Sequence, residues 1–154
     1  MQTEPATAIR ISIADQRLDL LAGDNVMASY PVSTSRFGLG SEPGSFKTPL
    51  GRFRIAEKIG EEMPLGTIFR GRIPLGPDDP LPETEDLITS RILWLEGLEE
   101  HNSNTRDRFI YIHGTKHEEA IGRPASCGCI RMRNLDIAKL FENVEVGTEV
   151  RIET

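Results

Sequence analysis

The stretch His113–Asn134 reads HGTKHEEAIGRPASCGCIRMRN and contains most of the chain's chemically reactive side chains. It includes two of the three histidines and both cysteines of the 154-residue chain. The residues just before it, FIYI at 109–112, have the β-branched and aromatic content that is typical of a strand. We therefore expect His113 at a strand end, with Cys129 following it by sixteen residues.

These residue types indicate nucleophilic catalysis by a thiol. A cysteine is a strong nucleophile when a nearby base or positive field keeps it deprotonated. Histidine is a suitable base because its ordinary pKa lies near neutrality. Gly128 can adopt backbone geometry that other residues resist, and the resulting turn can direct N–H groups at an oxyanion. The stretch therefore predicts a cysteine acyltransferase or hydrolase with nucleophile Cys129 and base His113.

The motif resembles the signature of the L,D-transpeptidases, the YkuD-domain family. The family signature is a histidine, a gap of about fifteen residues, and then Ser/Thr-His-Gly-Cys with an Asn or Arg shortly after. The resemblance implies that Cys129 is the nucleophile, that His113 is the base and that the carbonyl of Gly114 orients the imidazole. Cys127 stands where the family has its second histidine, which changes a residue that shapes the pocket. The matching segments are Ile-His-Gly-Thr at 112–115, Ile121-Gly122, Pro124, Ser-Cys-Gly-Cys-Ile-Arg-Met at 126–132, Lys-Thr-Pro-Leu-Gly at 47–51 and Gly147-Thr148.

The resemblance also implies a substrate and a reaction. The substrate is a peptidoglycan stem peptide that ends in D-alanine after a diamino acid, attacked at its L,D bond to give a Cys129 thioester. An amine acceptor would make the protein a transpeptidase, whereas water would make it an L,D-carboxypeptidase, and the motif does not choose between them. The alternative without activity is a cell-wall-binding or zinc-structured module, inactivated by the change at Cys127.

Four further residues are candidates for substrate contact. A guanidinium at Arg131 can bind a substrate carboxylate in bidentate fashion, or it can pair with a neighbouring glutamate on the surface. Cys127 lies at a position that shapes the pocket. Ser126 belongs to the same group, although loop support by hydrogen bonding is its preferred role. Asn134 completes the group and is also expected to cap the helix that follows.

Zinc binding and a disulfide are the competing interpretations of the same histidines and cysteines. They form H-x-x-x-H and C-x-C, which are zinc-ligand residue types. However, C-x-C is tighter than the usual spacing, and H-x-x-x-H requires a helix that His113 would not share. A bridge between Cys127 and Cys129 would close a small, strained ring. We expect no metal, no cofactor and two thiols, with reversible oxidation of the pair as the alternative.

Length and charge restrict the class of protein. A chain of 154 residues predicts one domain, 1–154, large enough to fold without disulfides. The net charge of −6 gives no basic surface for nucleic acid, and no stretch approaches the roughly 20 apolar residues that span a bilayer. We expect a monomer whose partners are stem peptides.

The N-terminus and the family resemblance give conflicting expectations about location. Residues 1–8, MQTEPATA, have neither the positive region nor the apolar region of a secretory signal peptide. The resemblance implies the periplasm or the cell envelope. A leader trimmed from the chain, an unconventional export route and retention in the cytoplasm are the three possible resolutions.

Hydrophobic patterning predicts a mainly-β, β-sandwich-like fold with one or two short helices, as the family resemblance also implies. The residues from 60 to 90 are rich in proline and glycine and are expected to form a lid or rim beside the cleft, or else a surface excursion. A helix is expected at 135–143, and T-x-x-E at 115–118 predicts a capping box that starts a helical turn. Strands are expected at 8–13, 17–21, 26–32, 52–59, 67–70, 91–95, 109–112 and 149–152.

Overall fold

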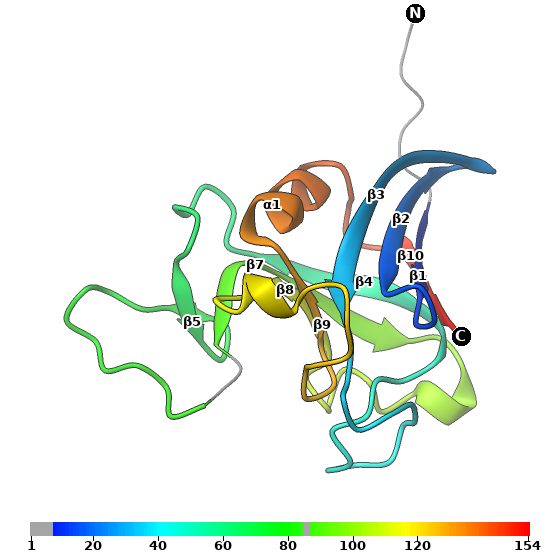
Figure 1. Cartoon of the computed structure of the whole chain (residues 1–154), viewed down its shortest axis with the longest axis horizontal. Coiled ribbons are helices and arrows are strands. Elements are labelled where there is room, and N and C mark those ends of the chain that lie inside the picture. The colour runs from blue at the N-terminus through cyan, green and yellow to red at the C-terminus, as the bar shows by residue number, and fades with distance from the viewer. Residues whose placement is uncertain (1–7, 85–86) are drawn as a thin grey trace, which may run out of the picture.

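The computed structural model describes residues 8–84 and 87–154, and its strands all belong to one sheet (Figure 1). The prediction about a leader falls on residues 1–7 and so lies outside the described residues. The strands are β1 (Ala8–Ser12), β2 (Arg17–Ala22), β3 (Asn25–Ser33), β4 (Gly51–Ile59), β5 (Ile68–Arg70), β6 (Ile73–Pro74), β7 (Ile88–Gly97), β8 (Tyr111–Gly114), β9 (Ile130–Met132) and β10 (Glu149–Glu153). The helix is α1 (Asn134–Glu142), and two 3-10 turns are η1 (Glu100–Asn102) and η2 (Glu118–Ala120).

The sheet closes on itself. Its order is β4-β10-β1-β2-β3-β9-β8-β7-β5-β6, and β4 also pairs with β7, so that eight strands form a ring and the hairpin β5–β6 extends from β7. Strands β1 and β10 run parallel, as do β8 and β9, whereas the other pairs are antiparallel. The prediction of a mainly-β, sandwich-like fold is confirmed, and the closed ring makes its two layers opposite walls of one sheet.

The main core fills the inside of this ring. Alternate residues of each strand point inward, as the period-2 pattern predicts, and Ile9 and Ile11 of β1 are both fully buried. Helix α1 packs against β7 and β8 and adds its own buried side chains Ile137, Leu140 and Phe141 (Figure 1). No helix among the described residues is long and apolar enough to cross a membrane.

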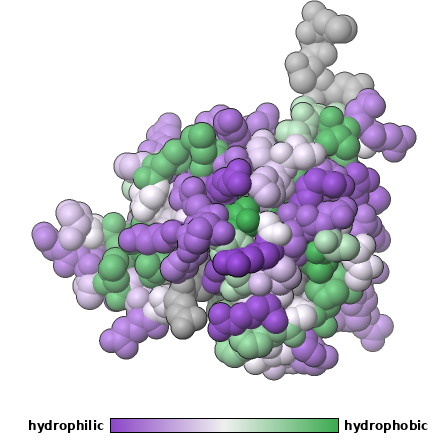
Figure 2. All heavy atoms as spheres, viewed as in Figure 1, coloured by the Kyte–Doolittle hydropathy of each residue, from purple (hydrophilic) through white to green (hydrophobic). Residues whose placement is uncertain are grey.

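The outer face of β7 and β8 carries a second, smaller apolar cluster of Phe69, Ile92, Trp94 and Tyr111. The hairpin β5–β6 packs there through Phe69, which is 2% exposed. The expected strand at 67–70 is thus β5, and residues 68–74 of the region expected to form a lid or rim make a hairpin against the outside of the sheet. In the view of Figure 2, hydrophilic and hydrophobic side chains are mixed over the surface.

Several element boundaries differ from the sequence-based predictions. Strand β8 begins at Tyr111 and not at Phe109. Phe109 has a φ of +56°, which is incompatible with the extended backbone of a strand. Strand β9 was not predicted, since three residues are too few to show alternation. Strand β7 begins at Ile88, before the expected residue 91, and β6 was also missed.

The predicted helix caps are wrong. The N-cap of α1 is Arg133, without a side-chain cap hydrogen bond, and Asn134 is already helical. The amide of Asn134 instead donates to the carbonyl of Thr115 (2.9 Å) and to Oε1 of Glu118 (2.8 Å). Glu118 is therefore occupied with Asn134 and does not complete a capping box, although the expected short helical turn is present as η2.

Candidate active site

The parallel pairing of β8 and β9 brings the two halves of the motif together. Ile112 lies opposite Ile130, and both point into the main core. Because side chains alternate, His113 and its partner Arg131 point outward from the ring. Cys129 precedes β9 by one residue, and its sulfur accepts the backbone N–H of Tyr111, two residues before His113. The pairing of the two strands thus brings the thiol and the imidazole to the same outer face.

His113 is completely buried, and its orientation is fixed by the backbone. Its Nδ1 lies 2.5 Å from the carbonyl oxygen of Gly114. A carbonyl can only accept, so Nδ1 carries the proton and Nε2 is the basic nitrogen. A Cβ at Gly114 would lie 2.6 Å from the carbonyl oxygen of Thr89, so this close packing requires glycine.

The thiol of Cys129 is held at the edge of the outer cluster. Its Sγ accepts the backbone N–H of Tyr111 (3.3 Å) and lies 3.4 Å from the carbonyl oxygen of Phe109. Cys129 is partly buried and packs against the cluster that contains Trp94 and Tyr111. The N–H of Tyr111 and the carbonyl of Phe109 thus fix the position of the sulfur.

The residues just before the thiol form a tight turn. Gly128 has a φ of +119°, a conformation that favours glycine. The hydroxyl of Ser126 donates to the carbonyl of Cys129 (2.6 Å) and accepts the N–H of Gly128 (3.3 Å). Ser126 is fully buried, so its observed contacts are those of a loop support and not of a substrate ligand. The N–H of Gly128 therefore donates inside the turn, to the hydroxyl of Ser126.

The Lys-Thr-Pro-Leu-Gly segment at 47–51 braces this turn from behind. Thr48 is fully buried, and its hydroxyl donates to the carbonyl of Gly128 (3.0 Å) while accepting the N–H of Ser35 (3.0 Å). A Cβ at Gly128 would lie 3.3 Å from the carbonyl oxygen of Lys47. The segment therefore supports the nucleophile, and it also leads into β4 at Gly51.

Arg108 ties the brace to the strand that carries the base. Its guanidinium donates to the carbonyls of Lys47 (2.8 Å) and Gly40 (3.3 Å). Burial lowers the pKa of Arg108, whereas the negative charges of Glu42 and of a Cys129 thiolate raise it. Since this attraction is mutual, Arg108 contributes positive potential at the nucleophile. Sequence patterns did not indicate Arg108, because it lies outside the motif in an irregular segment.

The remaining candidates lie around the pair. Arg131 is 4% exposed and lines a cavity of about 410 Å³ together with Arg36, His117, Glu119, Ala120 and Ala125. Cys127 is partly buried, and no disulfide joins it to Cys129. Asn134 lies in a polar network with the hydroxyls of Thr89 and Ser90, removed from the thiol turn. Among the described ranges, no group of three or more His, Cys, Asp and Glu side chains could hold a metal ion.

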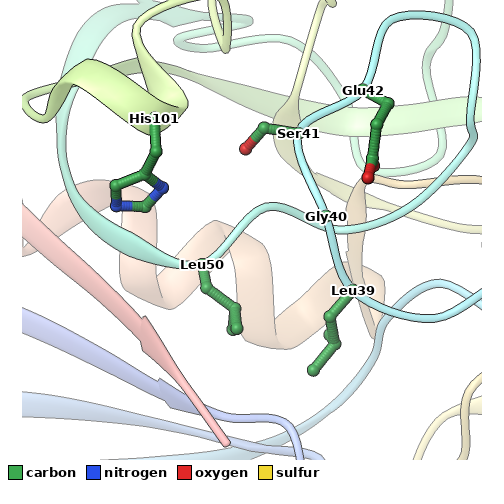
Figure 3. Close-up of a pocket in the computed structure, with 6 residues that line it drawn as sticks. All are labelled: Leu39, Gly40, Ser41, Glu42, Leu50 and His101. Carbon is green, nitrogen blue, oxygen red and sulfur yellow. The ribbon is translucent and has the colours of Figure 1, made fainter.

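A larger cavity of about 540 Å³ lies on the far side of the brace (Figure 3). Figure 3 shows His101 across from Ser41 and Glu42, with Leu39 and Leu50 below them. None of the residues that line it belongs to the motif at 113–134. The Nε2 nitrogen of His101, which lines this cavity, lies 3.5 Å from Oε1 of Glu99. This cavity therefore contains neither Cys129 nor His113.

A closed β-ring that presents a cysteine and a histidine on the outer face of two parallel strands defines a class of mainly-β domain with a Cys–His site. The family model of the L,D-transpeptidase catalytic domain, YkuD, matches residues 6–152. The chain belongs to this family.

Known relatives and solved structures agree with this assignment. The chain is 30% identical over 158 residues to the probable L,D-transpeptidase ErfK/SrfK of Escherichia coli K12, and the match covers 94% of the chain and 43% of that protein. The chain thus spans less than half of this relative. The fold is similar to the L,D-transpeptidase of Xylanimonas cellulosilytica (TM-score 0.63, 17% identity, 99% of the chain and 62% of that structure). It is also similar to L,D-transpeptidase 3 of Mycobacterium tuberculosis in complex with a faropenem-derived adduct (TM-score 0.62, 18% identity, 97% and 61%).

Proposed function

We propose that this chain is a peptidoglycan-modifying cysteine transpeptidase that acts on the L,D bond of tetrapeptide stems through a Cys129 thioester. The observation that carries the proposal is the shared outer face of Cys129 and His113, with the thiol on a braced glycine turn. Family membership supports the substrate class, because the relatives are L,D-transpeptidases. By the same family argument, we place the reaction in the cell envelope.

The first half of the reaction forms the thioester. The Nε2 nitrogen of His113 first takes the proton of the Cys129 thiol, and the resulting thiolate attacks the carbonyl carbon before the terminal D-alanine to form a tetrahedral oxyanion. His113, oriented by the Gly114 carbonyl, gives a proton from Nε2 to the nitrogen of the departing D-alanine. The C–N bond breaks, D-alanine leaves and the acyl group stays on sulfur. The backbone N–H of Cys129 is the proposed oxyanion donor, since that of Gly128 is directed at Ser126.

The second half resolves the thioester. The amine of a neighbouring stem attacks the acyl carbon, His113 accepts its proton, and the thiolate leaves to complete a cross-link. Water in place of the amine would give an L,D-carboxypeptidase with the same residues in the same roles. Arg131 and Cys127 are the proposed contacts to the substrate on the cavity side, where Arg131 can bind a carboxylate.

The test is an assay of D-alanine release and dimer formation on purified tetrapeptide muropeptides. Release with dimers supports the transpeptidase, and release without dimers supports the carboxypeptidase. The absence of both, from folded protein with Cys129 reduced, would favour an inactive cell-wall-binding module. One zinc per chain by elemental analysis would favour the zinc-structured module instead.

A second test uses a covalent probe and needs no acceptor. A carbapenem should acylate Cys129, because its strained amide carbonyl meets an activated thiolate. The solved relative from Mycobacterium tuberculosis carries a faropenem-derived adduct, which supports this expectation. Intact-protein mass spectrometry followed by peptide mapping identifies the site. An adduct on Cys127 would show that the reactive thiol is two residues away from the proposed position.

A further inference from the structure

The outer face beside the nucleophile carries three aromatic rings, which we call the aromatic cluster: Trp94, Phe109 and Tyr111. The Trp94 ring meets that of Tyr111 edge-on at 5.8 Å and lies 6.0 Å from that of Phe109, between ring centroids. Trp94 and Tyr111 are buried, but Phe109 is 51% exposed. Because the Tyr111 N–H donates to the Cys129 sulfur, this cluster directly adjoins the reacting atom.

The hairpin β5–β6 places a cation on this cluster. Arg72 lies in the turn of the hairpin, and its guanidinium is 4.7 Å from the centroid of the Trp94 ring and 5.5 Å from that of Phe109. Its Nη1 donates to the Tyr111 hydroxyl (3.2 Å). Two rings and a hydroxyl therefore fix the orientation of a side chain that would otherwise be flexible.

The charge of Arg72 has no ion-pair partner in the part of the chain that the structure describes. No carboxylate within residues 8–84 and 87–154 forms an ion pair with it, and the residue is exposed. Arg106 gives the contrast, because its guanidinium also lies over Trp94 (4.8 Å) but pairs with Glu57 (3.3 Å). Burial raises the pKa of the Tyr111 hydroxyl, against the opposing effect of Arg72, so the phenol is neutral at neutral pH and does not cancel the cation.

An exposed and oriented guanidinium beside a reaction site is suited to a planar anion. Of its five N–H donors, the contact with Tyr111 uses one, and the fork of the others matches both oxygens of a carboxylate. The position is specific as well, because the backbone of Tyr111 holds the nucleophile while its side chain holds Arg72. A carboxylate bound by Arg72 would thus lie near the hydroxyl end of the Tyr111 side chain, whereas the attacked carbonyl would lie near its backbone.

We propose that Arg72 is a specificity-determining residue that binds a carboxylate of the substrate next to the attacked bond. This proposal rests on the proposed function and adds to it the chemical feature that this side of the site selects. Two carboxylates of a stem peptide are candidates: that of the terminal D-alanine and, where the diamino acid before it is a dicarboxylic acid, the side-chain carboxylate of that residue. Arg131 lies on the neighbouring strand β9, where it pairs with His113, and is not part of this contact.

The experiment compares tetrapeptides that differ only in these carboxylates. One peptide has both, one has the terminal carboxylate as a carboxamide, and one has the side-chain carboxylate as a carboxamide. The wild-type enzyme should show a KM roughly 10–100-fold higher for at least one of the two carboxamides, which corresponds to the loss of a hydrogen bond to a charged group. The carboxamide whose KM increase disappears in Arg72→Gln identifies the carboxylate that Arg72 binds. If neither substitution changes KM, the proposal is wrong, whatever the variants do.

The variants assign this selectivity to Arg72. Arg72→Gln should raise the KM of the unmodified peptide by the same roughly 10–100-fold and should leave the KM of the identified carboxamide unchanged. Arg72→Lys should retain part of the selectivity. Arg106→Gln is the matched control, because it removes an equal charge from the same ring, and it should change KM for all peptides by less than about threefold. A purely structural Arg72 would instead change the values for all three peptides equally.

Binding measurements separate this proposal from the proposed function. Calorimetry with the Cys129→Ala protein measures the affinity for the same three peptides without turnover. If the wild type releases no D-alanine, the proposed function fails, but carboxylate-dependent binding that is lost in Cys129→Ala/Arg72→Gln would still support Arg72. Binding that does not depend on either carboxylate would overturn the inference even in an active enzyme.

Discussion

At the scale of single residues, Cys127 and Cys129 are only two positions apart but have different surroundings. Cys129 is held by the Tyr111 N–H beside the aromatic cluster, whereas Cys127 precedes the turn at Gly128. Cys127 also replaces a histidine of the family signature. The chemistry therefore predicts different consequences for the loss of each thiol.

Cys129→Ala should lower kcat for D-alanine release by roughly 10⁴-fold or more, because it removes the atom that forms the acyl-enzyme. Cys127→Ala should keep activity within about tenfold of the wild type, since the proposed role of Cys127 is a substrate contact that forms no covalent bond. Steady-state kinetics on a tetrapeptide stem measures both. Equal losses would mean that the two cysteines are wrongly assigned.

Gly128 offers a test of the turn itself. Gly128→Ala should lower the free energy of unfolding by about 1–2 kcal/mol, because of its positive φ, and should also reduce kcat strongly. The new Cβ would press on the carbonyl oxygen of Lys47, at 3.3 Å, and so displace the thiol. Urea unfolding and the release assay measure the two effects.

Gly122→Ala is the control for this variant. Gly122 has a similar φ of +104°, but open space surrounds its Cβ position. It should therefore show a similar loss of stability with nearly unchanged kcat. A Gly128→Ala enzyme of normal kcat would show that the turn does not position the nucleophile.

At the scale of elements, the site depends on segments that are distant in the sequence. The turn at 126–129 is supported by the brace at 47–51 through the hydroxyl of Thr48. Arg108 in turn holds the brace through the carbonyl of Lys47. The nucleophile is thus positioned by three parts of the chain. Loosening any one of them should reduce catalysis without touching the reacting atoms.

Thr48→Val isolates this brace. Valine keeps the shape but removes the hydroxyl that contacts the Gly128 carbonyl and the Ser35 N–H, and two buried groups lose a partner. We expect a loss of about 2–3 kcal/mol in the free energy of unfolding and a lower kcat with little change in KM. Thr67→Val, whose hydroxyl contacts Pro64 at the surface, is the control and should change neither quantity appreciably. A normal kcat in folded Thr48→Val would refute the role of the brace.

Sequence patterns anticipated the elements whose signal is local. The alternation of Ile9 and Ile11 predicts β1, and the motif predicts which cysteine and histidine to consider. Strand β9 was not predicted, because its three residues form a strand only through pairing with β3 and β8. The prediction of a cap at Asn134 was wrong because its side-chain oxygen, the atom that would cap the helix, instead accepts from the hydroxyls of Thr89 and Ser90, which the fold brings close. The contacts of Arg108 and Arg72 were not predicted for the same reason, because tertiary structure determines their partners.

At the scale of the whole molecule, the ring is held together by polar networks as well as by its core. Asp19 of β2 links neighbouring strands, because its carboxylate accepts from Arg10 of β1 (2.9 Å) and from Ser29 of β3 (2.6 Å). Arg17 adds a third contact at 3.1 Å. Asp19 is only 3% exposed, so these contacts bear on the stability of the entire sheet.

This network makes stability depend on pH in a definite direction. Burial alone would raise the pKa of Asp19, but Ser29, Arg10 and Arg17 together hold it below its ordinary value of 3.8. A carboxyl whose pKa is lower in the folded state stabilises the fold above its unfolded pKa, and this stabilisation disappears as the pH falls through the folded pKa. Asp19→Ala should therefore cost about 2 kcal/mol at pH 7, and the difference from the wild type should shrink below about pH 4. Urea unfolding at pH 7, 5, 4 and 3 measures this.

Asp15→Ala is the control for this variant. It removes an exposed carboxylate 3.6 Å from Arg17 and should change the free energy of unfolding little at any pH. A deficit in Asp19→Ala that stays constant down to pH 3 would show that packing, and not charge, accounts for the contribution of Asp19.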